Sequence, residues 1–343
     1  MAKRQKLSSY QLNDLPNEII LKSFGFIDIK ELLLCGQVSK RFRAIANDKS
    51  LWLKLNLCGR KVPYEFIEKA AENGCKYLSL VDYDILRLTG KSETSFNLKY
   101  LNMSWGLNVV RLPKLLQNCS SLQKLSLAYM TLHSDDIQDI CRNCQTLQVL
   151  DLERASIHFP NQTKVFQDLF TNCSHLTELN VRALNWSQLH IQAIVDNLTS
   201  TIVKVNFNDN RLLNDKHVKK LVERCNKITQ LGLRGTQITN DSVKSIITHL
   251  NTSLENLDVS EIKVDSTALL EFKFITTLKT LIYSNDGVKD SETLKKRLRH
   301  ISINEEKDLH IAKPFKIVNK KTDFDCFWEI RAKKQYLFVG KFF

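Results

Sequence analysis

Apolar residues alternate with other residues in short segments throughout the middle of the chain. A motif of two apolar residues separated by one position recurs at intervals of 23 to 29 residues. An alternation of this kind predicts short strands whose apolar side chains point inward. The first residues of the nine motifs are Leu78, Leu101, Leu125, Leu150, Leu179, Val205, Leu231, Leu257 and Leu281.

The stretches between these strands are typical of short helices. Residues 134–144, 214–225 and 240–250 each begin with a residue that can cap a helix and carry apolar residues three and four apart. A period of 20 to 29 residues is typical of leucine-rich repeats. One repeat cannot bury its own apolar face, so we predict an α/β solenoid, a horseshoe with a parallel sheet on its concave side.

Four cysteines stand three residues before the apolar residue that flanks the next strand: Cys119, Cys144, Cys173 and Cys225. A half-buried thiol packs there as a small hydrophobe, a pattern that resembles the cysteine-containing class of leucine-rich repeats. Only Asn210 matches the asparagine of the commoner class. Cys141 and Cys144 lack a second pair at zinc spacing, so we predict neither a metal site nor a cofactor.

The positions between the strand leucines are predicted to face outward on the concave side. They and their neighbours include Lys124, Asp151, Glu153, Glu178, Arg182, Lys204, Asn206, Arg211, Arg234, Asp258 and Glu261. The cations Arg182, Lys204, Arg211 and Arg234 come from three successive strands. An acidic or phosphorylated partner could therefore meet several of them at once, although a merely solvated face is an equally good interpretation of any one residue.

The segment before the repeats has helical periodicity in three blocks, Ile19–Phe26, Glu31–Val38 and Phe42–Ala46. A module this small cannot bury a large core and should expose apolar surface for another protein. We divide the chain into a flexible basic amino terminus (1–11), this all-α domain (12–56), about nine repeats (57–312) and a tail (313–343) that folds back on the repeats.

The helical segment resembles an F-box. The matching residues are Leu15-Pro16, Glu18-Ile19-Ile20, Phe24, Phe26-Ile27-Asp28, Glu31-Leu32, Val38-Ser39-Lys40-Arg41-Phe42 and Leu51-Trp52. The resemblance implies docking on the Skp-type adaptor of a cullin-RING ubiquitin ligase. It implies that Leu15, Pro16, Ile19, Ile20, Phe24, Val38, Phe42 and Trp52 contact that adaptor or support the contact surface.

The tail is similar to that of the S-phase-kinase-associated type of F-box/leucine-rich-repeat protein, in Ile317–Lys321 and Trp328-Glu329-Ile330. That resemblance implies a substrate receptor that captures a phosphorylated cyclin-dependent-kinase inhibitor together with a small Cks protein. The residues implied for substrate or Cks binding are Arg182, Lys204, Arg211, Arg234, Glu261 and Trp328. Gly235, Glu261 and Ala183 depart from that pattern, where an acidic residue, a basic residue and a tryptophan are expected.

Charge and composition bear on whether the chain binds nucleic acid, spans a membrane or is secreted. The chain has 50 Lys and Arg against 37 Asp and Glu, but residues 62–286 hold 24 of each sign. A nucleic-acid groove would concentrate the excess on the main surface, so we predict no nucleic-acid partner. The chain lacks a membrane span, and its basic start lacks the apolar core of a secretory signal. We expect nuclear and cytoplasmic residence.

No nucleophile elbow, metalloprotease motif or phosphate loop occurs in the sequence, so we predict a non-catalytic receptor. Two alternatives remain open. The chain could be an F-box receptor for an unrelated substrate, or a leucine-rich-repeat scaffold outside any ligase. In a scaffold the helical segment would merely cap the solenoid, and the apolar residues between positions 15 and 52 would be buried within the chain.

Overall fold

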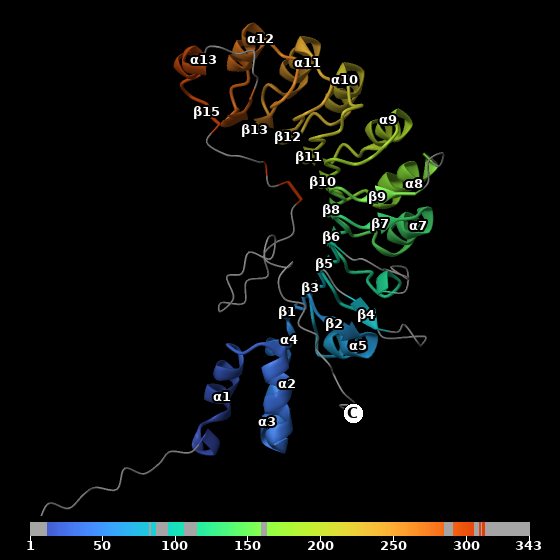
Figure 1. The fold of residues 1–343 in the computed structure, drawn as a ribbon, viewed down its shortest axis with the longest axis vertical. Helices are drawn as coiled ribbons and strands as arrows, with labels where there is room; N and C mark the ends of the chain where they lie inside the picture. The colour runs from blue at the N-terminus through green and yellow to red at the C-terminus, as the bar shows by residue number, and fades with distance from the viewer. Residues whose placement is uncertain are drawn as a thin grey trace, which may run out of the picture.

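The computed structural model describes residues 12–81, 84–86, 95–105, 115–158, 163–284, 291–304, 309 and 311–312. A small helical unit at the amino terminus leads into an arc of parallel strands with helices along its outer side (Figure 1). The helical unit contains η1 (Leu12–Asp14), α1 (Asn17–Phe24), α2 (Ile29–Val38), α3 (Lys40–Ala46) and α4 (Lys49–Trp52). The three predicted helical blocks of this unit are confirmed.

Eleven parallel strands form the concave sheet in chain order. They are β1 (Lys54–Asn56), β3 (Tyr77–Ser79), β5 (Tyr100–Asn102), β6 (Lys124–Ser126), β8 (Val149–Asp151), β10 (Glu178–Asn180), β11 (Lys204–Asn206), β12 (Gln230–Gly232), β13 (Asn256–Asp258), β14 (Thr280–Ile282) and β15 (Ser302–Ile303). Each of the nine predicted motif residues is the central residue of a strand, and these residues pair with one another along the sheet. The predicted solenoid is confirmed.

Two strands of the sheet, β1 and β15, were not predicted. The β1 residue Leu55 pairs with Leu78 of β3, so β1 opens the solenoid although it falls inside the predicted 12–56 domain. At the other end, Ile303 of β15 pairs with Leu281. A single strand at each end of an array lacks the flanking pattern that makes internal repeats recognisable.

Helices and two small sheets complete the repeats. The helices are α5 (Tyr64–Glu72), α7 (Ser134–Asn143), α8 (Lys164–Asn172), α9 (Gln188–Asn197), α10 (Asp215–Arg224), α11 (Asn240–Leu250), α12 (Ser266–Glu271), η2 (Phe272–Phe274) and α13 (Ser291–Arg297). Strand β2 (Lys61–Pro63) pairs with β4 (Asp84–Leu86), and β7 (Thr131–Leu132) pairs with β9 (Ser156–Ile157). The three predicted inter-strand helices correspond to α7, α10 and α11. No helix in the described ranges combines the length and apolar character needed to cross a bilayer.

A continuous apolar core runs through the solenoid between the sheet and the helices. The four repeat cysteines, Cys119, Cys144, Cys173 and Cys225, are fully buried in it, as predicted. Burial raises the pKa of the Cys119 thiol to about 12 and that of Cys225 to about 11. The eight cysteines of the described part are all free thiols. The four repeat cysteines fill space in the core, and their raised pKa values favour the thiol over the thiolate.

In eight of the turns within the described ranges, one position after the strand adopts the left-handed backbone conformation. It lies four residues after the central strand residue and is occupied by Gly59, Trp105, Tyr129, Arg154, Ala183, Asp209, Gly235 and Glu261. Glycine adopts this conformation freely, whereas any other residue loses about 1–2 kcal/mol. The row of side chains at this position forms one rim of the horseshoe, which we call the turn rim.

After the last strand the chain returns to the concave side. Leu309, Ile311 and Ala312 are buried against Val149 and Ile282, which belong to strands β8 and β14. The backbone N–H of Ala312 donates to Glu178 Oε2 at 3.3 Å. The predicted tail, 313–343, and its Trp328 lie outside the described residues.

Hydrogen bonds between successive repeats lock the helical layer, and Asp215 makes four of those within the described ranges. Its carboxylate accepts from the backbone N–H and the hydroxyl groups of Thr239 and Ser242, at 2.5–3.2 Å. Burial alone would raise the pKa of Asp215, but these hydrogen bonds outweigh it and hold the pKa below its ordinary value. The α10 end of one repeat thereby caps α11 of the next.

We predict that Asp215→Asn lowers the free energy of unfolding at pH 7 by about 1.5–3 kcal/mol, the range for hydrogen bonds to a charged group. A depressed folded-state pKa contributes stability above the unfolded pKa near ~4, which is lost as the pH falls through the folded pKa. The difference from wild type should therefore shrink below about pH 4. Urea unfolding at pH 7 and pH 3.5 measures it. Asp241→Asn, whose side chain is 77% exposed, is the control, and an equal loss in both variants would contradict the prediction.

Candidate functional site

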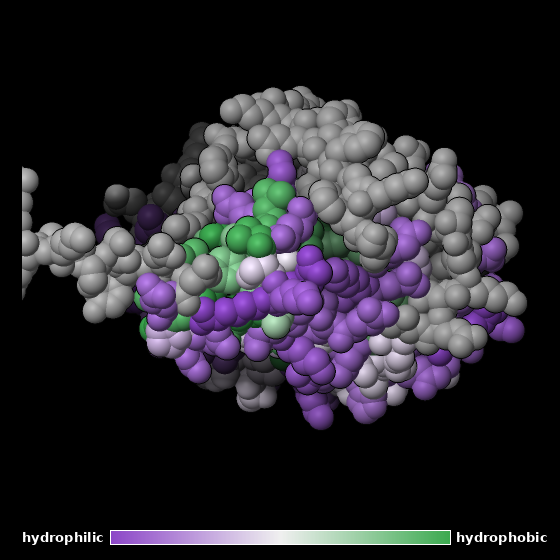
Figure 2. Space-filling view, turned by 90° about the horizontal axis from the view of Figure 1, so that it is seen from below, coloured by the Kyte–Doolittle hydropathy of each residue, from purple (hydrophilic) through white to green (hydrophobic). Residues whose placement is uncertain are grey.

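The helical unit exposes large apolar side chains. Five of them belong to η1, α1, α2 and the loop between α1 and α2, and they are Leu12 (58% exposed), Ile19 (43%), Phe26 (57%), Leu34 (51%) and Val38 (72%). Figure 2 views this end of the molecule and shows apolar residues gathered in its middle among polar ones. Exposed apolar groups in this number mark a surface that another macromolecule covers. We call these five residues the F-box face.

The eight predicted adaptor residues divide into two groups. Pro16, Ile19 and Val38 are exposed and Leu15 is half-buried. The other four are buried: Ile20, Phe24, Phe42 and Trp52 are 1%, 7%, 4% and 1% exposed. The side chains of these four residues hold the helices together, which fits the supporting role that the resemblance allows, and the adaptor contacts themselves stay a prediction. Leu12, Phe26 and Leu34 were not predicted, although the spacing of Leu34 and Val38 by one helical turn was a usable signal.

The buried group forms a small core of its own. Ile20, Phe24 and Phe42 pack with Leu32, Ile45 and Ala46, and the rings of Phe24 and Phe42 meet edge to face with centroids 5.6 Å apart. This core sets the relative positions of α1, α2 and α3. It thereby fixes which side chains remain outside.

Arg41 of α3 positions the segment that carries Leu15 and Pro16. Its Nη2 donates to the carbonyl oxygen of Leu15 at 2.5 Å, and its Nε donates to Asn17 Oδ1 at 2.8 Å. Charge-assisted hydrogen bonds of this kind give geometric precision as well as energy. The entry to α1 is therefore tied to α3.

Trp52 and Arg60 join the helical unit to the solenoid. The Trp52 ring belongs to the solenoid core and lies 5.8 Å from the Phe66 ring of α5, while its Nε1 donates to the Ala46 carbonyl at 2.8 Å. Arg60, after β1, pairs with Asp28 at the start of α2, with Nη2 and Oδ2 3.2 Å apart. The F-box face is thus held in a defined orientation relative to the repeats.

On the concave side, the residue after the central strand residue is a small polar one in most repeats. Asn102, Asp151, Asn180, Asn206 and Asp258 each accept the backbone N–H two residues later, at 3.0–3.1 Å. These residues are 0–5% exposed, so the prediction that Asp151, Asn206 and Asp258 face outward is wrong. Burial raises the pKa of Asp258, which Ser260 and Asn208 partly offset by donating hydrogen bonds.

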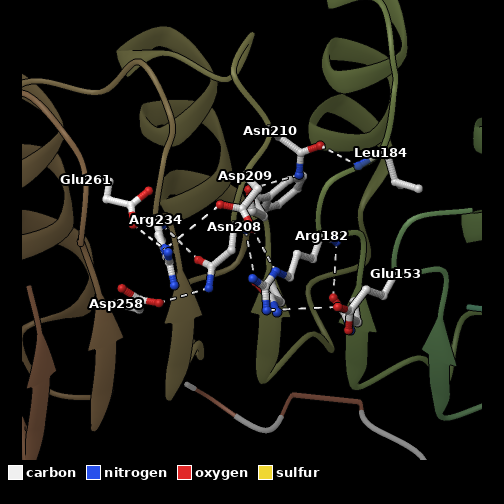
Figure 3. A network of polar contacts seen from close by, with 12 residues as sticks. Glu153, Arg182, Leu184, Asn208, Asp209, Asn210, Arg234, Asp258 and Glu261 are labelled. Carbon is white, nitrogen blue, oxygen red and sulfur yellow. Dashed lines mark hydrogen bonds and ion pairs between the residues drawn. The ribbon is translucent and has the colours of Figure 1, made fainter. Parts of the chain in front are cut away.

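Charged side chains of alternating sign form a row along the concave side (Figure 3). Some lie two residues after the last residue of a strand, and the others lie on the turn rim. Arg182 Nε lies 2.8 Å from Asp209 Oδ2, and its Nη1 lies 3.9 Å from Glu153 Oε1. Arg234 Nη2 lies 2.5 Å from Glu261 Oε1, and its Nε lies 4.0 Å from Asp209 Oδ1. Five successive repeats therefore contribute three carboxylates and two guanidinium groups. We call these five residues the charge row.

The charge row changes the sequence-based expectation for Arg182 and Arg234. Both arginines are on the concave side, but each is already paired with carboxylates of the neighbouring repeats. A partner phosphate would have to displace Glu153, Asp209 or Glu261 before it could use them, and this competition weakens any contact that the phosphate gains. The sequence could not show this, because the paired residues are 27 positions apart.

The other predicted cations differ from each other. Lys204 Nζ pairs with Glu178 Oε1 at 3.0 Å, and Glu178 also accepts the backbone N–H of Ala312. Arg211 is exposed and has no carboxylate partner within the described ranges. It therefore remains the predicted cation most available to an anionic group. No three side chains of the His, Cys, Asp or Glu type gather closely enough in the described ranges to hold a metal ion.

Comparison with known proteins agrees with these features. The SKP2 LRR domain model matches residues 66–335, and the F-box-like model matches residues 12–58. The chain combines an F-box-like module with leucine-rich repeats, and it belongs to the family defined by the SKP2 LRR domain.

The similar curated proteins match within the F-box-sized part of the chain. F-box protein dre-1 of Caenorhabditis elegans is 43% identical over 54 residues, which cover 15% of this chain and 6% of that protein. Human F-box only protein 15 is 45% identical over 42 residues, covering 12% and 8%. The chain thus spans less than a tenth of the length of these relatives. Among solved structures, an internalin of Listeria monocytogenes is 15% identical with a TM-score of 0.45, covering 87% of this chain and 100% of that one.

Proposed function

We propose that this chain is the substrate-recognition subunit of an SCF-type cullin-RING ubiquitin ligase. The F-box face docks on a Skp-type adaptor, which joins it to a cullin, and the repeats and tail bind the substrate. The chain performs no chemistry itself, because a ligase of this kind acts by holding the substrate close to a charged ubiquitin carrier. The observation that carries the proposal is the exposure of Leu12, Ile19, Phe26, Leu34 and Val38.

This exposure argues against a scaffold in which the helical unit merely caps the solenoid. A cap would direct its apolar residues toward the first repeat, as Trp52 does. The F-box face instead points to solvent while the rest of the unit is packed and oriented by Trp52 and Arg60. A rigid module with an uncovered apolar surface favours a role as an anchor for a second protein.

For the substrate, we propose a phosphorylated cyclin-dependent-kinase inhibitor captured together with a Cks protein, promoting its degradation and cell-cycle progression in the nucleus and cytoplasm. Arg211 is exposed and has no carboxylate partner among the described residues, which supports an anionic contact on the distal repeats. The charge row, whose two arginines are already paired, together with Gly235 and Glu261 favours the alternative of a receptor for a different substrate. In either case the F-box role is unchanged.

The experiment is affinity purification of the tagged full-length chain from cells, with identification and quantification of the bound proteins. Recovery of an adaptor, a cullin and a Cks protein supports the whole proposal. We expect Arg211→Glu to reduce Cks recovery at least about tenfold, as for loss of a charge-assisted contact. Lys216→Glu is the control, because it reverses the charge of another exposed cation on the same repeat, and it should leave Cks recovery unchanged. Adaptor and cullin without Cks would replace the substrate proposal by the alternative, and absence of the adaptor would overturn the ligase role.

A further inference from the structure

Three successive repeats place large planar groups at the same position of the turn rim. The rings of Trp105 and Tyr129 are stacked, with centroids 3.9 Å apart and planes at 14°. The Arg154 guanidinium lies over the Tyr129 ring, with Cζ 5.8 Å from its centroid. We call these three residues the rim stack. No sequence pattern points to any of them.

The rim stack occupies positions that disfavour bulky residues. Trp105, Tyr129 and Arg154 have φ angles of 63°, 61° and 52°, a region where large side chains are unusual. Gly59 and Gly235 make the same turn in other repeats, so the fold does not need an aromatic residue there. Bulky residues kept in an unfavourable backbone conformation are a pointer to function.

The surface of the rim stack is accessible and has an uncompensated charge. The Trp105 side chain is 42% exposed, and Arg154 is exposed as well. Among the described residues Arg154 has no carboxylate partner. The preceding Glu153 is engaged elsewhere, by Arg182 at 3.9 Å and by the side-chain amide of Asn180 at 3.3 Å. Among the described residues, a ligand on this rim therefore meets an exposed aromatic side chain followed by a positive charge that no carboxylate pairs.

We propose that the rim stack binds an extended substrate segment that carries a proline and an acidic residue three positions apart. Proline-rich segments in the polyproline II conformation dock on aromatic surfaces with little loss of entropy. Three residues of such a segment span about 9.3 Å, and two strand spacings are about 9.4–9.8 Å. A proline on Trp105 therefore places an acidic side chain beside Arg154, two repeats along. The inference rests on the proposed function in treating the segment as part of a substrate.

Fluorescence anisotropy with labelled synthetic peptides tests this assignment on the full-length chain. The probe is Gly-Ser-Pro-Ala-Pro-Glu-Ser-Gly, and the matched peptides carry Gln or Lys in place of Glu. We expect saturable binding of the Glu peptide, at least fivefold weaker binding of the Gln peptide and none of the Lys peptide. Failure of the Glu peptide to saturate, or an equal affinity for all three, would overturn the assignment.

Variants locate the binding. Trp105→Gly suits the left-handed turn, so it should fold as wild type while binding the Glu peptide at least tenfold more weakly. Arg154→Ala should abolish the preference for Glu over Gln. The control is Phe274→Ala, because Phe274 is also an exposed aromatic residue (58%) with a lysine, Lys273, over its ring at 4.9 Å; its removal should change nothing. Unaltered peptide binding by Trp105→Gly would contradict the proposal.

Two further measurements separate this inference from its alternatives. Oligouridine that binds the chain more tightly than the Glu peptide and is lost in Trp105→Gly would assign the rim stack to nucleic acid and overturn the peptide proposal. Adaptor recovery from the same preparations is expected to be unchanged by Trp105→Gly. Peptide binding without adaptor recovery would leave the rim stack as a peptide site and refute its role with a ligase substrate.

Discussion

Glutamate at both Ile19 and Val38 is expected to reduce adaptor binding by about three orders of magnitude, because each central apolar contact of an interface contributes about 2 kcal/mol or more. Both side chains are exposed, at 43% and 72%. The substitutions should therefore change the stability of the isolated chain by no more than about 0.5 kcal/mol. Titration of purified adaptor against the immobilised chain measures the affinity, and thermal unfolding measures the stability.

The control for this prediction is an exposed leucine in the solenoid. Leu189 of α9 is 63% exposed, so Leu189→Glu removes a comparable apolar side chain and adds the same charge. It is expected to leave adaptor binding unchanged. Wild-type affinity in the Ile19 and Val38 variant would show that the F-box face is not the adaptor site, and an equal loss in the control would show a general charge effect.

Replacing Trp52 by alanine is expected to lower the free energy of unfolding by about 3–5 kcal/mol, as for other buried aromatic residues. The side chain is 1% exposed, packs with the first repeats and donates to the Ala46 carbonyl. Its loss removes an apolar contact between the helical unit and the solenoid core. We therefore expect the junction to open first, with faster hydrogen exchange in residues 46–64 than in the distal repeats.

Trp52→Phe separates packing from hydrogen bonding at this junction. Phenylalanine keeps much of the contact with Phe66 but cannot donate to Ala46, so it should lose about 1 kcal/mol beyond its smaller volume. Urea unfolding followed by circular dichroism gives both values. A loss below about 1 kcal/mol in Trp52→Ala would mean that the helical unit and the solenoid are not coupled through this side chain.

The repeating architecture follows from the sequence alone. The nine strand centres follow from the spacing of apolar pairs, and the repeat cysteines follow from their fixed distance to the next strand. This works because every repeat must bury the same face against its neighbours, so the constraint is local and recurs. The end strands β1 and β15 were not predicted, because a strand at the end of the array packs against one repeat only. Its sequence therefore carries fewer of the apolar positions that recur in the internal repeats.

The tertiary structure decided which residues of the F-box segment face solvent. Helical periodicity predicts helices that carry the apolar residues Ile19, Ile20, Phe24 and Phe42. It does not show which of these side chains fill the small core. Three short helices can pack in several ways, and Trp52 is buried through contacts with Phe66, which follows it by 14 positions. Exposure therefore depends on the packing of separate elements.

The charge state of the concave side was likewise decided by the tertiary structure. In the sequence Arg182 and Arg234 are isolated cations, whereas stacking of the repeats sets Asp209 between them and Glu261 beside Arg234. The rim stack arises in the same way, from Trp105, Tyr129 and Arg154 in three separate repeats. Residues of neighbouring repeats contact one another although they are far apart in the sequence, by 27 positions in the hydrogen-bonded pairs of Arg182 and Arg234. A local pattern of side chains does not reveal such contacts. The sequence thus fixes the fold of each repeat, and the stacking of repeats determines which charges are neutralised and which surfaces remain open to a partner.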